Sequence, residues 1–389
     1  MKIGLVCPYS IAKGGGVQEV VKALQLEYIK QGHEAVIITP QPKEPYNDRN
    51  HQVIFLGSAA DFKSPLATTT QVSASVMTDE IDNVLETEQF DILHFHEPWV
   101  PVLSRQILSR SQCVNIATFH AKLPETIASR ALAKVVIPYT KPLLKYIDAF
   151  TAVSEAAAEY LRSLSDVHIE IIPNGIHPTH FRRPAHLADT PKNGPTILYV
   201  GRLEKRKGVK YLLLALQLLQ ERLPEARLVI AGDGVDREKL EGMVEDLQLQ
   251  HVEFLGFIDD RTKLELLHTA DLFCSPALYG ESFGIVLLEA MSSGLVTVAG
   301  NNPGYESVMT GLGQLSLVDP RDTKEFAHRL ELLLRDVGIR ELWKKWAKKH
   351  IRQFDYSRVA GMYLDAYEAA IANGKLRERR AVDEDWFRT

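Results

Sequence analysis

The run Tyr-Gly-Glu-Ser-Phe-Gly-Ile-Val-Leu-Leu-Glu-Ala-Met at residues 279–291 follows an apolar, strand-like run at 270–276. Its second half, 285–291, has the composition and length of a helix, so 282–284 should form the first turn. Backbone N–H groups at a helix start lack partners within the helix and carry partial positive charge, so they bind anions, most often phosphate. Gly284 would let a ligand approach the backbone. The stretch predicts a phosphate-binding strand, turn and helix.

Two carboxylates flank this predicted anion site, Glu281 before the helix and Glu289 inside it. At about 1.5 Å rise per residue, Glu289 lies roughly 7 Å along the axis from Gly284, about the span from a diphosphate to its ribose. Carboxylates accept hydrogen bonds from hydroxyls and repel phosphate, so both should face sugars. The pattern predicts a nucleotide-sugar site. An alternative stays open, in which Glu281 caps the helix and Glu289 lies on its solvent face.

Length and composition indicate a soluble chain of two domains. Its 389 residues are too many for one ordinary core, and a formal net charge of −5 gives no reason to expect nucleic acid. Cys7, Cys113 and Cys274 lie far apart in apolar runs and are expected to be buried free thiols in a reducing cytosol. The apolar start is too short for a signal peptide, and no run is long enough to span a membrane. We expect a cytoplasmic protein.

Short apolar runs alternate with helix-length segments twice along the chain. Parallel βαβ units produce this pattern and form doubly wound sheets. Between residues 173 and 195 the alternation lapses into a Pro- and Gly-rich segment, as expected of an interdomain connection. The sequence predicts an α/β protein with Rossmann-like domains at 1–184 and 185–357, the first joined by a C-terminal helix at 358–389.

Gly14-Gly15-Gly16 follows the first predicted strand, where dinucleotide-binding proteins carry a glycine fingerprint. The spacing differs from G-x-G-x-x-G, and Thr39-Pro40 stands where an acidic residue should close the next strand. The pattern therefore disfavours a nicotinamide cofactor. A plain flexible turn remains the alternative to a ligand-binding one.

The E-x7-E spacing from Glu281 to Glu289 resembles the retaining glycosyltransferases of family 4, and the resemblance extends over nearly the whole chain. It implies the GT-B architecture, in which two Rossmann-like doubly wound domains face across a cleft and the final helix crosses back to the first. It also implies transfer from a nucleotide-sugar donor, with no metal and no other cofactor. The shared stretches are residues 4–10, 15–18, 96–98, 117–120, 173–175, 201–202, 206–208 and 280–287.

Two cations, Arg202 and Lys207, directly follow the predicted strand at 197–200. A diphosphate leaving group gathers negative charge as the glycosidic bond breaks, and fixed cations beside it lower that barrier without a metal. The resemblance assigns both residues to the donor phosphates. Lys205, Arg206 and Lys210 are interpreted as ordinary surface charges.

The same resemblance implies the other donor contacts and the catalytic set. Glu289 would bind the ribose, and Glu281 with His120 would bind the transferred sugar. His120 would meet charge developing at the anomeric centre through its ring or its carbonyl. The predicted catalytic residues are His120, Arg202, Lys207 and Glu281. The diphosphate would lie against Arg202, Lys207, Gly16 and the backbone of Phe283, Gly284, Ile285 and Val286.

Ile258, Asp260 and Lys263 bear on the base of the donor. Guanine presents two adjacent donors that one carboxylate can accept together, whereas uracil presents one. Family members that use GDP-mannose carry a matching Asp and Lys, which favours a GDP-sugar. Two alternatives stay open: the Asp259-Asp260 pair simply caps the following helix, or the donor is a UDP-sugar.

A metal site is a further interpretation of His94, His96, Glu97 and His120, because alternate residues on a strand share a face. Zinc needs a convergent ligand set with second-shell support, and the family mechanism needs no metal. We therefore predict no metal, and treat these residues as strand-end side chains.

The acceptor side departs from the family members that act on phosphatidylinositol. Tyr9, Gln18, Thr118 and Lys122 match their acceptor pocket, but Ala12 replaces an acid and Trp99 an asparagine. The acidic segment 79–91 stands where those enzymes carry a basic cluster, and it would repel an anionic membrane. The basic amphipathic segment 122–146 could replace that cluster as a peripheral membrane contact, or could be an ordinary helix covering a sheet.

The sequence thus predicts a metal-independent retaining hexosyltransferase. The expected reaction moves mannose from GDP-mannose to a hydroxyl of a lipid-linked or polyol acceptor such as phosphatidylinositol. The alternatives are a UDP-sugar-dependent glucosyl or N-acetylglucosaminyl transferase of the same family, a nucleotide-sugar epimerase on the same scaffold, and a binding module without catalysis.

Overall fold

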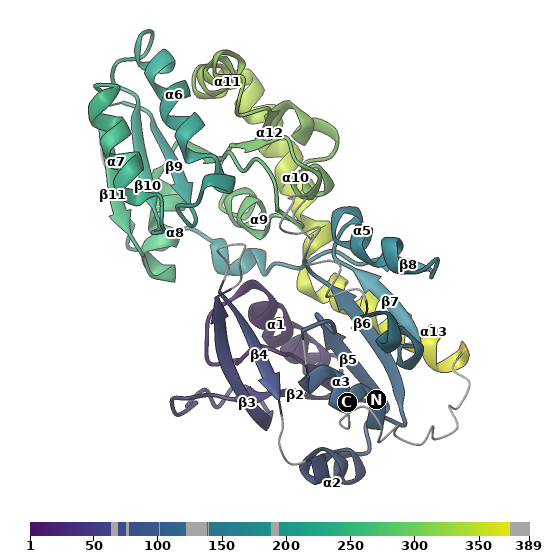
Figure 1. Cartoon of the computed structure of the whole chain (residues 1–389). Helices are drawn as coiled ribbons and strands as arrows, with labels where there is room; N and C mark the ends of the chain where they lie inside the picture. Colours follow the sequence, from purple (N-terminus) through teal and green to yellow (C-terminus); the bar gives the residue numbers. More distant parts are fainter. Residues whose placement is uncertain are drawn as a thin grey trace. The chain divides into compact units, whose positions relative to one another are not determined.

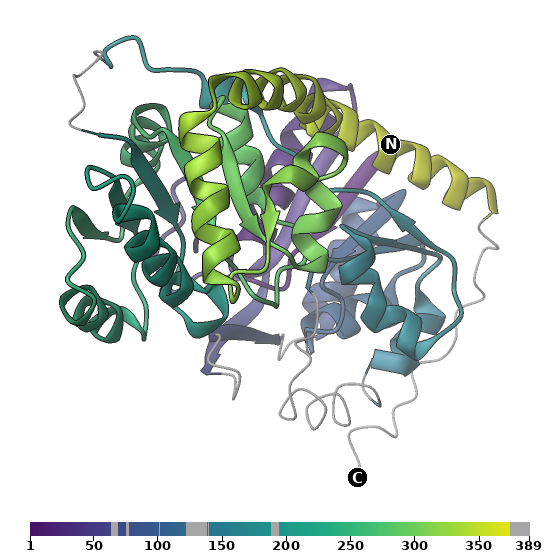
Figure 2. The same cartoon turned by 90° about the horizontal axis from the view of Figure 1, so that it is seen from above.

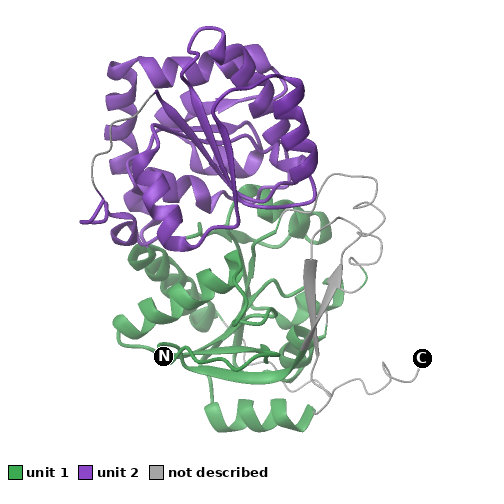
Figure 3. Ribbon diagram, turned by 90° about the vertical axis from the view of Figure 1, so that its left-hand side faces the viewer, with its two compact units in different colours: residues 1–174, 356–389 green, residues 175–355 purple. Residues whose placement is uncertain are grey.

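The computed structural model describes residues 1–63, 69–74, 78–100, 102–121, 138, 140–187 and 194–373. The chain divides into two compact units, residues 1–174 with 356–389 and residues 175–355 (Figure 3). These boundaries lie at 174 and 355, whereas the sequence placed them at 184 and 357. The difference arises because residues after 174 belong to the second unit: the Ile176 N–H donates to the Phe354 carbonyl at 2.7 Å, and the 3-10 turn η2 (Pro178–Phe181) contacts α9 (Ile285–Ser292).

Unit 1 is built on a sheet in which the described strands follow the order β4-β3-β2-β1-β5-β6-β7-β8. Neighbouring strands pair in parallel, except that β4 runs antiparallel to β3 at one edge. The strand β5, Ile-Leu-His-Phe-His, is buried at every position, as expected of a strand covered on both faces. The strands are β1 (Lys2–Val6), β2 (Glu34–Gln41), β3 (Val53–Lys63), β4 (Thr69–Ala74), β5 (Ile92–His96), β6 (Val114–Phe119), β7 (Ala149–Ala152) and β8 (Ile169–Ile171).

The helices of unit 1 connect these strands, and the last one comes from the end of the chain. Helix α13 (Tyr356–Asn373) packs against α1 and β6, and the hydroxyls of Tyr28 and Tyr367 lie 2.9 Å apart. Figure 2 shows α13, in yellow, running beside the purple and blue elements of unit 1. The other helical elements among the described residues are α1 (Gly16–Lys30), α2 (Thr78–Glu88), α3 (Leu103–Arg110), η1 (Lys141–Tyr146) and α5 (Glu155–Leu164).

Unit 2 contains a parallel sheet whose described strands follow the order β11-β10-β9-β12-β13-β14. Figure 1 labels β11, β10 and β9 side by side in this sheet. The strand order reverses between β9 and β12, and ligands of doubly wound sheets bind beyond the strand ends at such a point. The strands are β9 (Thr196–Val200), β10 (Arg227–Ala231), β11 (Val252–Gly256), β12 (Leu272–Ser275), β13 (Thr297–Gly300) and β14 (Leu317–Val318). The helical elements besides α9 are η3 (Lys205–Lys207), α6 (Val209–Gln220), α7 (Arg237–Asp246), α8 (Asp260–Thr269), α10 (Pro303–Val308), η4 (Gly311–Ser316), α11 (Thr323–Arg335), α12 (Val337–His350) and η5 (Ile351–Phe354).

The predicted fold class of two doubly wound α/β domains is confirmed by these sheets. The strands β3 and β4 were not predicted, since only residues 53–56 of β3 are continuously apolar before Gly57 and Ser58 interrupt the run. Within the described ranges, no helix combines the length and the apolar character needed to cross a bilayer.

Candidate functional site

The turn before α9 forms as a helix start that exposes its backbone. Gly284 is the N-cap and has φ +113°, in the left-handed region that favours glycine. A Cβ added there would lie 2.7 Å from the Tyr305 ring, so the position needs glycine for conformation and for space. The helix begins at Ile285, three residues later than the predicted first turn at 282–284. The amides of Ile285 and Val286 therefore begin the helix and carry its partial positive charge.

Glu281 does not cap this helix, because its carboxylate binds two cations from the turn after β9. Glu281 Oε1 lies 2.6 Å from Arg206 Nη1 and 2.8 Å from Lys207 Nζ. The structure thus brings together Glu281, Lys207 and the start of α9, as the nucleotide-sugar interpretation requires. Arg202 belongs to the same cluster through Glu204, whose Oε1 lies 2.8 Å from Arg202 Nη1.

Arg206 is a half-buried member of this cluster, whereas the sequence predicted an exposed surface charge. Its side chain is only 18% exposed and it binds Glu204 as well as Glu281. The residue types in the run Glu-Lys-Arg-Lys at 204–207 do not distinguish Arg206 from its neighbours, and the signal that could have singled it out is its place in the shared stretch 206–208. In the structure, Arg206 and Lys207 of the 3-10 turn η3 both contact the Glu281 carboxylate.

Glu289 also faces a cation rather than solvent. Lys263 Nζ lies 3.0 Å from Glu289 Oε1 and 3.2 Å from Asp260 Oδ1. Burial raises the pKa of Glu289, an effect that the nearby Lys263 opposes. Lys263 therefore joins two other predicted donor-binding residues, Asp260 and Glu289. Ile258 lies half-buried just before α8.

Of the two neighbouring acids Asp259 and Asp260, only Asp259 caps the helix that follows. Asp259 is the N-cap of α8 and accepts from the Thr262 N–H at 2.8 Å. The side chain of Asp260 is 97% exposed and contacts Lys263. Asp260 is consequently accessible to a ligand, whereas Asp259 has a structural role.

In unit 1, Gly16 begins α1 directly after Gly15, and a Cβ added at Gly15 would displace the end of the Gln18 side chain. Gln18 is itself buried at 7% exposure. Tyr9 lies in the loop after β1, where its carbonyl accepts from the Thr39 hydroxyl at 2.7 Å. Lys122 and most of the basic segment 122–146 lie outside the described residues.

The structure does not support the predicted acceptor role of the Thr118 side chain. Its hydroxyl is fully buried and lies 2.6 Å from His94 Nε2 and 2.5 Å from Thr151 Oγ1. His94 Nδ1 in turn lies 2.6 Å from the Tyr367 hydroxyl of α13. Thr118 and His94 therefore belong to an internal network that ties the sheet to the last helix.

His120 lies at the end of β6 beside His96 and Glu97. His96 Nδ1 and His120 Nε2 are 2.8 Å apart, and Glu97 Oε1 accepts from the His120 backbone N–H at 2.7 Å. Burial raises the pKa of Glu97 to about 8, and it lowers the pKa of His120 to about 3. These groups are therefore uncharged at neutral pH, so His120 can offer a neutral ring or its carbonyl.

No three His, Cys, Asp or Glu side chains form a group suited to hold a metal ion in the part of the chain that the structure describes. Both ring nitrogens of His94 already contact hydroxyls, which leaves it no lone pair for a metal.

Two doubly wound units, with cations and a helix start beyond the strands of the second, define the GT-B class of glycosyltransferases. Among solved structures, sucrose-phosphate synthase from Thermosynechococcus elongatus matches with a TM-score of 0.76 and 20% identity, over 96% of this chain and 100% of that chain. Anabaena HepE in complex with UDP and glucose matches with a TM-score of 0.71 and 17% identity, over 95% of this chain and 100% of that chain. These likenesses concern the fold.

Sequence comparison gives the family. Residues 14–180 match Glycosyltransferase Family 4, and residues 186–350 match Glycosyl transferases group 1. The phosphatidyl-myo-inositol mannosyltransferase of Mycolicibacterium smegmatis is 31% identical over 99% of this chain and 98% of the relative. The chain belongs to glycosyltransferase family 4, which confirms the predicted resemblance.

Proposed function

We propose that the protein is a retaining, metal-independent hexosyltransferase that moves mannose from GDP-mannose to a hydroxyl of a lipid-linked or polyol acceptor. The observation that carries the proposal is the cluster of Glu281, Lys207 and Arg206 beside the first turn of α9. It combines the three requirements of a nucleotide-sugar site: backbone amides and cations for the diphosphate, and a carboxylate for the sugar hydroxyls.

In this proposal the amides of Ile285 and Val286 bind the diphosphate together with Arg202 and Lys207. Negative charge grows on that diphosphate as the bond to the sugar breaks, and fixed positive groups stabilise this transition state more than the ground state. The departing phosphate can accept the proton of the acceptor hydroxyl, so the transfer needs no separate general base. Glu281 would hold the hydroxyls of the sugar, and His120 would meet charge at its anomeric carbon.

The pair of Asp260 and Lys263 supports a guanine base. The exposed Asp260 carboxylate can accept from both the N1–H and the 2-amino group of guanine, and Lys263 lies 3.2 Å from it. Glu289, held by the same lysine at 3.0 Å, would accept from the ribose hydroxyls. A UDP-sugar remains the second candidate donor, since HepE of the same fold is described with UDP and glucose.

The name of the mycobacterial relative supports phosphatidylinositol as the acceptor to test first. In such a reaction the enzyme would work in the cytoplasm as a peripheral protein at the inner face of the membrane. The acidic helix α2, with Asp79 and Glu80 in its first turn, is not suited to contact anionic lipid.

The test is incubation of the protein with GDP-mannose and UDP-glucose, each alone and with phosphatidylinositol or a membrane-lipid extract, followed by mass spectrometry. The proposal predicts mannosylated lipid from GDP-mannose and slow hydrolysis without acceptor. Transfer only from UDP-glucose would show the second candidate donor. An isomerised sugar would indicate an epimerase, and binding without turnover would indicate a module without catalysis.

A further inference from the structure

Arg206 lies at the centre of a chain of alternating charges in unit 2, which we call the ion chain: Arg202, Glu204, Arg206, Glu281 and Lys207. Arg206 Nε lies 2.9 Å from Glu204 Oε2, and Arg206 Nη1 lies 2.6 Å from Glu281 Oε1. At the two ends, Arg202 Nη1 lies 2.8 Å from Glu204 Oε1 and Lys207 Nζ lies 2.8 Å from Glu281 Oε1. Each end cation thus contacts one carboxylate of the chain, whereas Arg206 contacts both.

Arg206 is also fixed to the loop between β12 and α9. Its Nη1 donates to the Gly280 carbonyl at 3.3 Å, and its own carbonyl accepts from the Leu278 N–H at 2.8 Å. The Arg202 side chain, by contrast, is 56% exposed and can turn towards a ligand without moving the loop. The centre of the ion chain is therefore held more firmly than its exposed end.

A diphosphate would compete with the two carboxylates for the end cations. If Arg202 and Lys207 turn to phosphate oxygens, Glu204 and Glu281 each lose one counter-charge. Their side chains are only 15% and 12% exposed, and a poorly solvated carboxylate without a cation is costly. Burial disfavours the charge of Arg206, but Glu281 and Glu204 outweigh burial and raise its pKa, so Arg206 stays charged.

We propose that Arg206 is a positioning residue that holds Glu204 and Glu281 and thereby frees Arg202 and Lys207 to bind the diphosphate of the donor. The inference rests on the proposed function, because it needs a nucleoside diphosphate at the start of α9. It predicts that losing Arg206 makes Glu281 a competitor of the ligand for Lys207. Removing the charge of Glu281 as well should then restore nucleotide binding.

The test is calorimetric titration of GDP and of UDP into the full chain and four variants: Arg206→Met, Arg206→Lys, Glu281→Gln and the double variant Arg206→Met/Glu281→Gln. A charge-assisted hydrogen bond to a poorly solvated group corresponds to about a tenfold effect or more, so Arg206→Met should weaken nucleotide binding about tenfold. Arg206→Lys keeps a cation beside Glu281 and should recover part of this loss. Glu281→Gln should not weaken binding, and the double variant should bind within about threefold of the unaltered protein.

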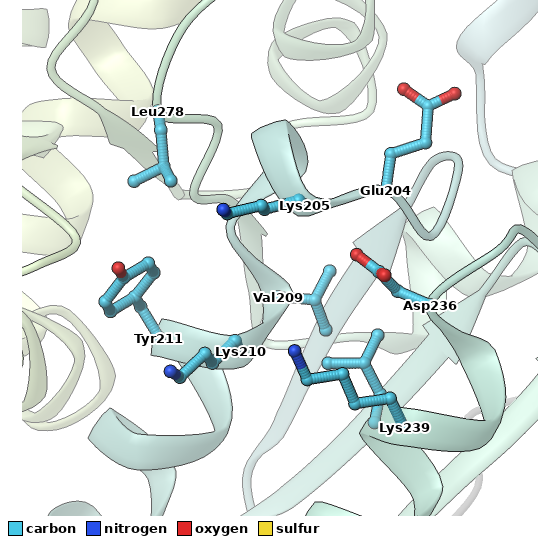
Figure 4. Close-up of a pocket in the computed structure, with 9 residues that line it drawn as sticks. Glu204, Lys205, Val209, Lys210, Tyr211, Asp236, Lys239 and Leu278 are labelled. Atoms are coloured by element: carbon cyan, nitrogen blue, oxygen red, sulfur yellow. The ribbon is translucent and has the colours of Figure 1, made fainter. Parts of the chain in front are cut away.

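Lys205→Met provides the matched control, since it removes a cation from the same turn. Figure 4 shows the Lys205 side chain extending away from Glu204, at a pocket of about 210 Å³ that is also lined by Lys210 and Lys239. This control should leave the affinity unchanged within about twofold, because Lys205 lies outside the ion chain. The melting temperature of every variant is measured alongside, so that a loss of folding is recognised.

Two results would overturn the inference while leaving the proposed function intact. Arg206→Met could bind the nucleotide as tightly as the unaltered protein, or the double variant could bind as weakly as Arg206→Met. The second result would mean that Arg206 acts on the phosphate directly or only through the loop. If the unaltered protein binds neither GDP nor UDP, the proposed function fails and the inference fails with it.

Discussion

Lowering the pH from 7 to 5 should destabilise unit 1, because its buried histidines stay neutral in the folded protein. His94 is fully buried between Thr118 and Tyr367, and burial, helped by the nearby His120, lowers its pKa from 6.5 to about 3. The unfolded chain takes up a proton below pH 6.5 that the folded chain does not bind. The stabilisation is therefore present above pH 6.5 and is lost as the pH falls towards 3.

The size of this destabilisation follows from the difference between pH 5 and 6.5, the ordinary pKa of His94. The difference is about 1.5 pH units, and each unit corresponds to about 1.4 kcal/mol, so His94 alone should lower the unfolding free energy by about 2 kcal/mol. Burial lowers the pKa values of His96 and His120 as well, and both act in the same direction.

Hydrogen exchange of the β5 and β6 amides, corrected for the intrinsic rate at each pH, measures this change locally. His94→Gln should reduce the loss of protection between pH 7 and 5 by about 2 kcal/mol. The exposed His168 offers a matched control in the same unit, and His168→Gln should retain the full pH dependence. Equal pH dependence in His94→Gln and the unaltered protein would show that burial does not keep His94 neutral in the folded chain.

Three further changes test other parts of the structure. Glu97 should oppose the histidines, because burial raises its pKa to about 8 and it stays largely protonated below that pH while the unfolded chain ionises. Its contribution to stability therefore falls as the pH rises from 5 to 8, and Glu97→Gln should show a larger loss of hydrogen-exchange protection between pH 7 and 5 than the unaltered protein. Gly284→Ala should lower the unfolding free energy by about 1–3 kcal/mol in urea titrations, through its positive φ and the Tyr305 ring. Lys263→Met should weaken GDP binding about tenfold by leaving Glu289 without its cation, measured by calorimetry.

The sequence predicted the local unit at 279–291 because three independent signals agree there. An apolar strand, a glycine at the turn and an apolar helical run each point to the same strand, turn and helix, and the structure places them at β12, Gly284 and α9. The parallel sheets were predictable for a related reason, since strands buried on both faces appear as continuous apolar runs.

Side-chain partnerships were less predictable, because they depend on contacts distant in sequence. Arg206 differs from Lys205 in the direction its side chain takes from η3, and Glu281 lies 75 residues away along the chain. Thr118 was assigned to an acceptor from its place in a motif, whereas its hydroxyl joins β6 to α13 in the interior. The unit boundary was misplaced by about ten residues because the bridge between Ile176 and Asp355 has no sequence signature.

A crystal structure of the protein with GDP bound tests the donor site most directly. We expect the diphosphate at the start of α9, within hydrogen-bond distance of the Ile285 and Val286 amides, with Lys207 turned to a phosphate oxygen and Arg206 still bound to Glu281. A nucleotide bound away from α9, with that helix start untouched by phosphate, would contradict this expectation.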